Sequence, residues 1–177
     1  MRIACIGYRD WALKIYSNIQ QNSEHSFLNI SSYDTYDDKF IIDFKPDLVM
    51  FYGWSWIVSN QLINNFTCLM LHPSPLPLYR GGSPIQNQIL EGKKVSKVTI
   101  LVMTEELDAG PIVGQRDISL EGDISDIFSE LTEKGTSITE DTYSLLFLAT
   151  LVRLEIAELS WNTSKDAELE LLALRFS

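Results

Sequence analysis

The chain has 177 residues and a formal net charge of −10, from 14 basic and 24 acidic residues. Its hydrophobic fraction of 45% excludes a disordered chain, and no apolar run reaches the roughly 20 residues that cross a bilayer. Because nucleic-acid binding normally requires a basic surface, the acidic balance argues against a nucleic-acid partner. We expect one domain without a signal peptide, located in the cytoplasm, with no membrane contact.

Strands and helices alternate along the sequence. Short apolar runs predict strands at residues 2–6, 27–31, 48–52, 67–71, 97–103 and 112–118. Apolar residues at helical spacing predict helices at residues 10–20, 58–66 and 83–90, a helix end at 40–44, and a long helical region that opens at 123 and resumes over 139–157. Because the strands are continuously apolar and the loops are short, we expect an α/β fold with a parallel sheet and helices on both faces.

The predicted domain spans residues 1–150, and residues 151–177 form a C-terminal extension. The last stretch, 160–177, is amphipathic and acidic, with leucines at Leu169, Leu171, Leu172 and Leu174. This segment is either a final helix packed on the domain or a contact to another subunit, so a homodimer stays open.

Several common kinds of site are missing from the sequence. Cys5 and Cys68 lie inside apolar runs, which indicates reduced core thiols rather than a disulfide, and no metal-ligand spacing occurs. The turn Gly7-Tyr8-Arg9 lacks the glycine patterns of dinucleotide and triphosphate sites. No serine stands in a nucleophile elbow. The sequence therefore predicts no metal and none of these nucleotide motifs.

His72 is the candidate centre of a site, because it is one of only two histidines and it follows an apolar run. In residues 72–86, four prolines fix the backbone and remove hydrogen-bond donors, while Gly81 and Gly82 let a ligand approach closely. Asp108 follows the next apolar run. A histidine and an aspartate that both leave strand ends can meet across a cleft, where open sheets bind ligands.

Residues 72–86 and 107–111 together resemble the signature of the 10-formyltetrahydrofolate-dependent formyltransferases, and residues 46–48 and 52–53 agree more loosely. The resemblance covers roughly residues 1–150. It implies a Rossmann-like formyltransferase fold and acyl transfer, in which an amine attacks the formyl carbon, an oxyanion forms and tetrahydrofolate leaves. His72 would then carry the proton or stabilise the oxyanion, and Asp108 would orient it or relay the amine's proton through water.

The resemblance also implies where the substrates lie. The donor, 10-formyltetrahydrofolate, would be bound by Trp54, Ser55, Trp56, Ile57, Ser74, Pro75, Leu76, Pro77, Thr104, Leu107 and Asp108. The acceptor would contact Tyr8, Arg9, Tyr79, Arg80, Gly81 and Gly82. Simple packing stays an alternative for the two tryptophans, and a solvated surface arginine stays one for Arg80.

One residue departs from the family pattern. The family usually carries an asparagine two residues before the histidine, and this chain has Met70 there. A thioether cannot donate a hydrogen bond to an oxyanion. Either another donor substitutes, with Ser74, Gln86, Asn87 or a backbone N–H as candidates, or the domain binds folate or a nucleotide without catalysis.

The family's acceptors are glycinamide ribotide, methionyl-tRNA and amino sugars on nucleotide carriers. The chain is similar to the small sugar N-formyltransferases around residues 52–56, including those of dideoxy-amino-sugar and pseudaminic-acid pathways. The tRNA enzymes carry a further C-terminal domain, for which this chain is too short and too acidic. We therefore expect a nucleotide-linked amino sugar as acceptor, with glycinamide ribotide and methionyl-tRNA as alternatives.

Overall fold

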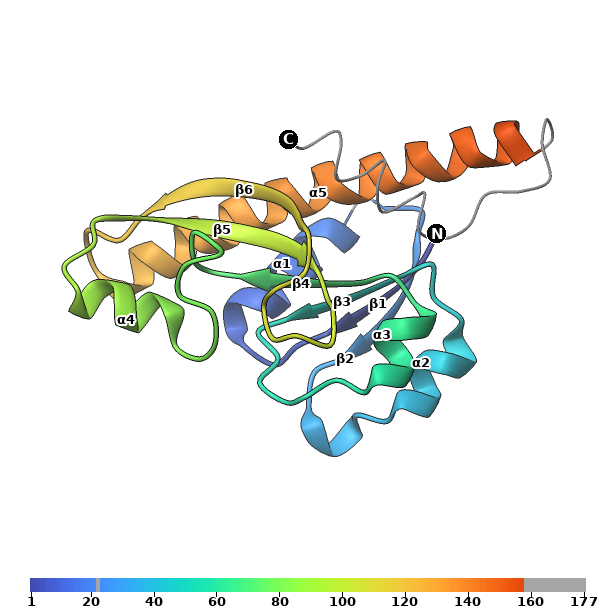
Figure 1. The fold of residues 1–177 in the computed structure, drawn as a ribbon, viewed down its shortest axis with the longest axis horizontal. Coiled ribbons are helices and arrows are strands. Elements are labelled where there is room, and N and C mark those ends of the chain that lie inside the picture. The colour runs from blue at the N-terminus through green and yellow to red at the C-terminus, as the bar shows by residue number, and fades with distance from the viewer. Residues whose placement is uncertain (22, 158–177) are drawn as a thin grey trace.

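A computed structural model describes residues 1–21 and 23–157 as one six-stranded sheet with helices on both faces (Figure 1). The strands are β1 (Arg2–Ile6), β2 (Ser26–Ile30), β3 (Leu48–Tyr52), β4 (Cys68–His72), β5 (Val95–Val102) and β6 (Ile112–Ser119). The helices are α1 (Asp10–Gln20), α2 (Asp38–Phe44), α3 (Asn60–Asn65), α4 (Pro84–Leu90) and α5 (Ile124–Ala157), with a 3-10 turn, η1, at Tyr33–Thr35. The predicted α/β architecture is confirmed.

The sheet is mixed rather than wholly parallel. Its strand order is β2-β1-β3-β4-β5-β6, and the first four strands run parallel. β5 runs antiparallel to β4, and β6 runs antiparallel to β5. The connection through α4 stays at the carboxyl edge of β4 and does not cross the sheet, so β5 must run back. A buried strand is apolar in either direction, and the sequence pattern therefore does not show this reversal.

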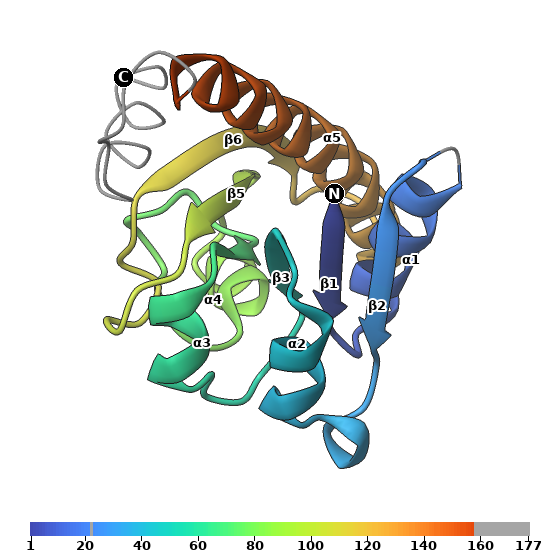
Figure 2. The same ribbon diagram turned by 90° about the vertical axis from the view of Figure 1, so that its right-hand side faces the viewer.

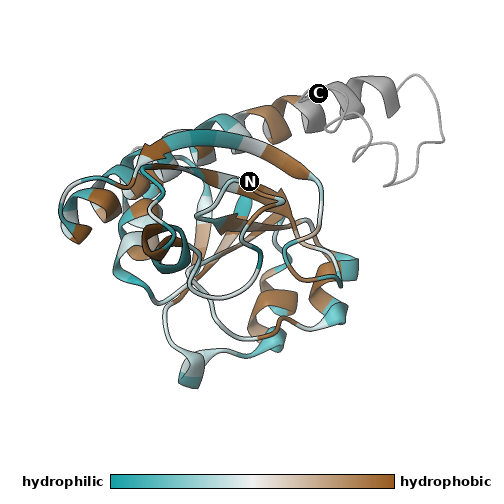
Figure 3. Cartoon of the chain, turned by 60° about the vertical axis from the view of Figure 1, so that its left-hand side comes forward, coloured by the Kyte–Doolittle hydropathy of each residue, from teal (hydrophilic) through white to brown (hydrophobic). Residues whose placement is uncertain are grey.

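Helices α1 and α5 cover one face of the sheet, and α2 and α3 cover the other (Figure 2). Each face has its own core, with Ile15 and Leu71 on the α1 side and Phe51 and Leu62 on the α3 side. The central strands are buried on both faces, whereas β6 at the edge is mixed in polarity (Figure 3). At Gly135 a Cβ would lie 2.5 Å from the Ile15 side chain, so only glycine lets α5 pack this closely.

Observed element boundaries mostly fall within two residues of those predicted, with two differences. β4 extends to His72, so the sheet holds the backbone of the candidate residue directly. α5 is one continuous helix, although the sequence predicted a region that opens at 123 and resumes over 139–157. Gly135 and the polar residues after it lie inside this helix. Burial against α1 outweighs their weak helix propensity. The predicted boundary at residue 150 stays a prediction, and residues 158–177 lie outside the described part of the chain.

The gap between the carboxyl ends of β1 and β3 is the topological switch point of the sheet, because β2 lies on one side of β1 and β3 on the other. The hydroxyl of Tyr16, on α1, fills this gap. It lies 2.9 Å from the carbonyl oxygens of Ile6 and Met50, and it accepts the N–H of Tyr52 at 2.9 Å. Tyr16 is buried, and this burial raises the pKa of its hydroxyl.

We expect Tyr16→Phe to lower the free energy of unfolding by about 1–3 kcal/mol, because it leaves buried backbone groups without partners. Urea denaturation followed by circular dichroism measures this change. The matched control is Tyr33→Phe, whose ring is exposed and which should change stability by about 0.5 kcal/mol or less. Equal losses in the two variants would contradict a structural role for the Tyr16 hydroxyl.

Candidate functional site

His72 ends β4 at the carboxyl edge of the parallel strands, with 5% of its surface exposed. Its Nε2 lies 2.8 Å from the carbonyl oxygen of Tyr79. A carbonyl only accepts hydrogen bonds, so Nε2 carries a proton and donates it. Its Nδ1 lies 3.5 Å from Oδ2 of Asp108. The structure therefore brings the two predicted catalytic residues together, and both are buried.

Asp108 reaches the histidine by an unexpected route. Because β5 is antiparallel, its last residue, Val102, lies beside Leu69 near the start of β4 rather than beside His72. Residues 103–111 then fold back toward the histidine. Gly110 allows this loop to close, since a Cβ there would lie 1.8 Å from the carbonyl oxygen of Val102.

The carboxylate of Asp108 is held between two loops. Its Oδ2 accepts the backbone N–H of Gly81 at 2.7 Å, so one oxygen contacts both the proline loop and the histidine. The backbone of Asp108 has a φ of 50°, in the left-handed region that aspartate tolerates better than most residues. Arg80 and Glu106 also join these two loops, through an exposed ion pair of 3.2 Å that contributes little to stability.

This arrangement leaves one nitrogen of His72 able to take up a proton. Since Nε2 donates to Tyr79, the neutral ring has its lone pair on Nδ1. A carboxylate 3.5 Å away stabilises the positive charge that forms when Nδ1 is protonated. The pair can therefore accept a proton from an attacking amine and return it to a leaving group.

The proline loop, residues 73–83, is held in place by side chains from outside it. Prolines at 73, 75 and 77 have no N–H, so the loop offers few internal donors to its own carbonyl groups. The carbonyl oxygens of Pro73, Ser74 and Leu76 instead accept hydrogen bonds from Gln88 at 3.2 Å, Thr99 at 2.6 Å and Gln115 at 3.1 Å, respectively. The loop is thereby fixed to α4, β5 and β6.

Sequence analysis missed these supporting residues. Gln88 and Thr99 are buried, Ser96 donates to the Gln88 side chain at 2.6 Å, and Gln115 also donates to Thr99 at 3.0 Å. The available signal was the presence of Ser96 and Thr99 in a strand whose other residues, apart from Lys97, are apolar. Buried polar side chains require partners, and two in one strand indicate a network beside it.

The residues predicted to bind folate lie in three loops, after β3, after β4 and between β5 and β6. In the proline loop, Ser74 and Leu76 are buried, the Ser74 hydroxyl donates to the carbonyl of Leu78 at 2.8 Å, and the Leu76–Pro77 peptide is cis. Pro75 is half-buried and Pro77 is exposed. Ser74 and Leu76 thus shape the loop rather than present free polar groups.

The other two loops are more open. Ile57 is 98% exposed, and Trp54, Ser55 and Trp56 precede it. Thr104 donates to the carbonyl of Glu106, and Leu107 is exposed. Among the described residues, the backbone N–H groups of Glu105 and Leu107 make no hydrogen bond to another backbone group, and both residues are exposed. These free groups could receive the hydrogen-bonding edge of a flat heterocycle.

The residues predicted to bind the acceptor fall into two groups, after β1 and after β4. Tyr8 bonds the Ser55 hydroxyl at 2.8 Å, and the guanidinium of Arg9 lies 4.9 Å from the Tyr8 ring. In the second group, the Tyr79 hydroxyl donates to Glu91, which raises the pKa of that tyrosine. At Gly81 and Gly82 an added Cβ would meet no atom within 4 Å, so the space beside them is open.

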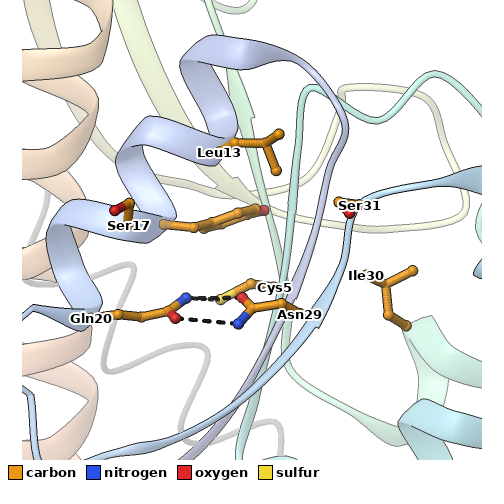
Figure 4. Close-up of a pocket in the computed structure, with 8 residues that line it drawn as sticks. Cys5, Leu13, Ser17, Gln20, Asn29, Ile30 and Ser31 are labelled. Carbon is orange, nitrogen blue, oxygen red and sulfur yellow. Dashed lines mark hydrogen bonds between the residues drawn. The ribbon is translucent and has the colours of Figure 1, made fainter.

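A cavity of about 330 Å³ lies elsewhere, between α1 and β2 (Figure 4). Gln20 and Asn29 exchange amide hydrogen bonds at 2.9 and 3.2 Å beside it, and Gln20 also donates to the sulfur of Cys5. Burial raises the pKa of the Cys5 thiol far above its usual range, so the thiol stays protonated. The cavity is lined by none of the predicted site residues.

Within residues 1–21 and 23–157, no group of three or more histidine, cysteine, aspartate or glutamate side chains could hold a metal ion. Across the same residues, no helix has the length and apolar character needed to cross a membrane. Cys5 and Cys68 are both buried, and neither forms a disulfide.

A family model described as formyl transferase matches residues 10–143, which include the whole His72–Asp108 site. The chain belongs to the formyl transferase family. Its match includes β2, β3 and β4, the proline loop and the loop that carries Asp108.

Relatives of this chain include methionyl-tRNA formyltransferases. That of Bacillus mycoides (strain KBAB4) is 31% identical over 150 residues, which are 80% of this chain and 47% of the relative. The chain thus spans about half the length of this curated relative. The solved methionyl-tRNA formyltransferase from Clostridium thermocellum superposes with a TM-score of 0.69 at 30% identity, over 75% of this chain and 60% of the other.

A sugar-modifying relative shares the fold. The formyltransferase PseJ from Anoxybacillus kamchatkensis, solved with UDP-4,6-dideoxy-4-formamido-L-AltNAc and tetrahydrofolate, superposes with a TM-score of 0.66 at 23% identity. The match covers 84% of this chain and 77% of PseJ. At this identity the likeness shows the fold alone.

We expect Thr99→Val to lower the free energy of unfolding by about 1–3 kcal/mol, because the Ser74 carbonyl loses its side-chain donor and Gln115 loses an acceptor at nearly unchanged side-chain volume. The matched control is Thr132→Val, since the Thr132 hydroxyl bonds only a carbonyl within its own helix. Urea denaturation of both variants provides the comparison. A loss no larger than that of the control would contradict a supporting role for Thr99.

Proposed function

We propose that this chain transfers a formyl group from 10-formyltetrahydrofolate to an amine, with His72 as proton carrier and Asp108 as its partner. The observation that carries this proposal is the buried contact of 3.5 Å between His72 Nδ1 and Asp108, beneath a rigid loop, in a chain of the formyl transferase family. The open backbone groups at Glu105 and Leu107 support folate as donor, because a pterin has an edge of hydrogen-bond donors and acceptors.

The reaction requires a proton to move from the attacking amine to the leaving nitrogen of the folate. The folate supplies the formyl carbon and that leaving nitrogen. Nδ1 of His72 takes the amine's proton while the new carbon–nitrogen bond forms, and Asp108 stabilises the resulting imidazolium. The same proton then goes to the folate nitrogen as its bond to the formyl carbon breaks. Burial of both side chains strengthens their electrostatic interaction.

Negative charge that develops on the formyl oxygen needs a donor other than Met70. Met70 lies on β4 two residues before His72, and alternation along the strand places both side chains on the same face. Of the candidate substitutes, the Ser74 hydroxyl is used by Leu78 and the Asn87 amide by the carbonyl of Gly82. Gln86 is exposed and makes no side-chain hydrogen bond with the described residues. The donor candidates that stay are therefore Gln86 and a backbone N–H.

For the acceptor, we propose the amine of a nucleotide-linked amino sugar. The net charge of −10 supports a small acceptor rather than a large RNA, and PseJ, which shares the fold, was solved with a nucleotide-linked sugar. The second candidate is methionyl-tRNA, which is favoured by the names of relatives at 31% and 30% identity. A cytoplasmic location and a homodimer stay predictions.

The decisive experiment follows tetrahydrofolate release from 10-formyltetrahydrofolate with purified protein, comparing UDP- and dTDP-linked amino sugars, glycinamide ribotide and methionyl-tRNA with a blank without acceptor. We expect release that depends on a nucleotide-linked amino sugar. His72→Gln and Asp108→Asn should each lower the rate by about 10²-fold or more. The first removes the proton carrier, and the second removes the negative charge that stabilises the protonated histidine. If tetrahydrofolate is released only with methionyl-tRNA, then methionyl-tRNA is the acceptor and the nucleotide-linked amino sugar is not. Near wild-type rates in both variants would remove the mechanism.

Met70→Asn distinguishes a catalytic site with a substituted hydrogen-bond donor from a binding module whose catalysis is impaired. If Gln86 supplies the donor, the change should leave the rate within about threefold, while Gln86→Ala lowers it by about 10²-fold. Asn87→Ala is the matched control on the same helix. A large gain in rate from Met70→Asn, with no effect of Gln86→Ala, would indicate a binding module whose catalysis is impaired.

A further inference from the structure

Five aromatic residues meet at the carboxyl ends of β1, β2 and β3. We call this cluster the aromatic platform, and its members are Tyr8, Tyr33, Tyr36, Trp54 and Trp56. Trp54 contacts all four other rings, with centroid distances between 4.7 and 6.2 Å. Tyr33 and Trp56 stack at 4.6 Å with an interplanar angle of 20°. The platform thus joins three loops that are far apart in sequence.

Packing alone does not explain the platform. Tyr33 is 53% exposed and Trp56 is 40% exposed, although both lie against other aromatic rings. A cluster that served only as a small core would cover its outermost rings, because burying apolar area is what stabilises such a core. The exposed stacked pair instead presents flat aromatic surface to solvent, which suits a planar ligand ring.

The platform occupies the place where open sheets bind ligands. Tyr8 follows β1 and Trp54 follows β3, so these residues flank the topological switch point. The next strand, β4, ends at His72. Neighbouring strands are about 4.8 Å apart, so a ligand of two or three linked groups can extend from the platform to the histidine.

A positive charge lies beside these rings. The guanidinium of Arg9 is exposed and lies 4.9 Å from the Tyr8 ring. None of the ion pairs formed by the described residues includes Arg9. In a chain with a net charge of −10, an unpaired arginine beside an aromatic surface suits a phosphate attached to a planar ring.

We propose that the aromatic platform binds the base of the acceptor's nucleotide by stacking on Tyr33 and Trp56, while Arg9 binds its phosphate. The inference rests on the proposed function for identifying this nucleotide as part of the formyl acceptor. It assigns a binding role to Tyr33. It also gives the rings of Trp54 and Trp56, which the family resemblance placed beside the folate, to the nucleotide, and leaves the folate near Glu105 and Leu107.

Isothermal titration of the full chain with UDP, dTDP, CDP, GDP and ADP, and separately with 5-formyltetrahydrofolate, tests this assignment. We expect at least one nucleotide to bind, and Tyr33→Ala to raise its dissociation constant about tenfold. Phe40→Ala is the matched control, because Phe40 is an equally exposed ring outside the platform. Arg9→Ala should weaken the nucleoside diphosphate but not the nucleoside, whereas Lys14→Ala should change neither.

Three results would overturn the inference: no binding of any nucleotide, equal effects of Tyr33→Ala and Phe40→Ala, or a Tyr33→Ala effect on the folate alone. The last would make the platform part of the donor site. Binding is measured without turnover, so the two proposals fail separately. Nucleotide binding through Tyr33 without formyl transfer would remove only the proposed reaction. Formyl transfer to an acceptor without nucleotide binding would remove only the platform's role.

Discussion

The loop after β4 has too few N–H donors for its own carbonyl groups, so donors from outside the loop complete its hydrogen bonds. The geometry of the site depends on these outside donors. Three prolines cause the shortage, and side chains from α4, β5 and β6 supply the missing donors. His72 belongs to the same scheme, because its Nε2 donates to the carbonyl of Tyr79. The loop thereby fixes the tautomer of the histidine and leaves Nδ1 to face Asp108.

The antiparallel end of the sheet makes this support available. β5 pairs with β4 only from Leu69 to His72, and its earlier residues continue past the end of β4. Thr99 donates directly to the Ser74 carbonyl of the proline loop, and Ser96 donates to the side chain of Gln88. The reversal also sends residues 103–111 to the opposite end of β4, so Asp108 reaches the histidine only because that loop folds back. The antiparallel direction of β5 thus determines both the support of the proline loop and the position of Asp108.

The parallel half of the sheet has a different role. Tyr16 joins the ends of β1 and β3 through its hydroxyl, and the loops after these strands stay in contact through Tyr8 and Ser55. Aromatic side chains gather on those loops, whereas the proton-carrying pair lies above β4. Ligand binding and proton transfer can therefore use separate loops that the same sheet positions.

The sequence by itself determined the alternation of strands and helices, the two catalytic candidates and the proline loop, because apolar period, proline and glycine act locally. It also identified the family, since those local constraints recur in its members. Only the tertiary structure decided the direction of β5, the continuity of α5, the partners of the loop carbonyls and the meeting of Tyr33 with Trp56. Each of these depends on residues distant in sequence, and a buried strand or an isolated threonine has the same local pattern whichever partner it finds.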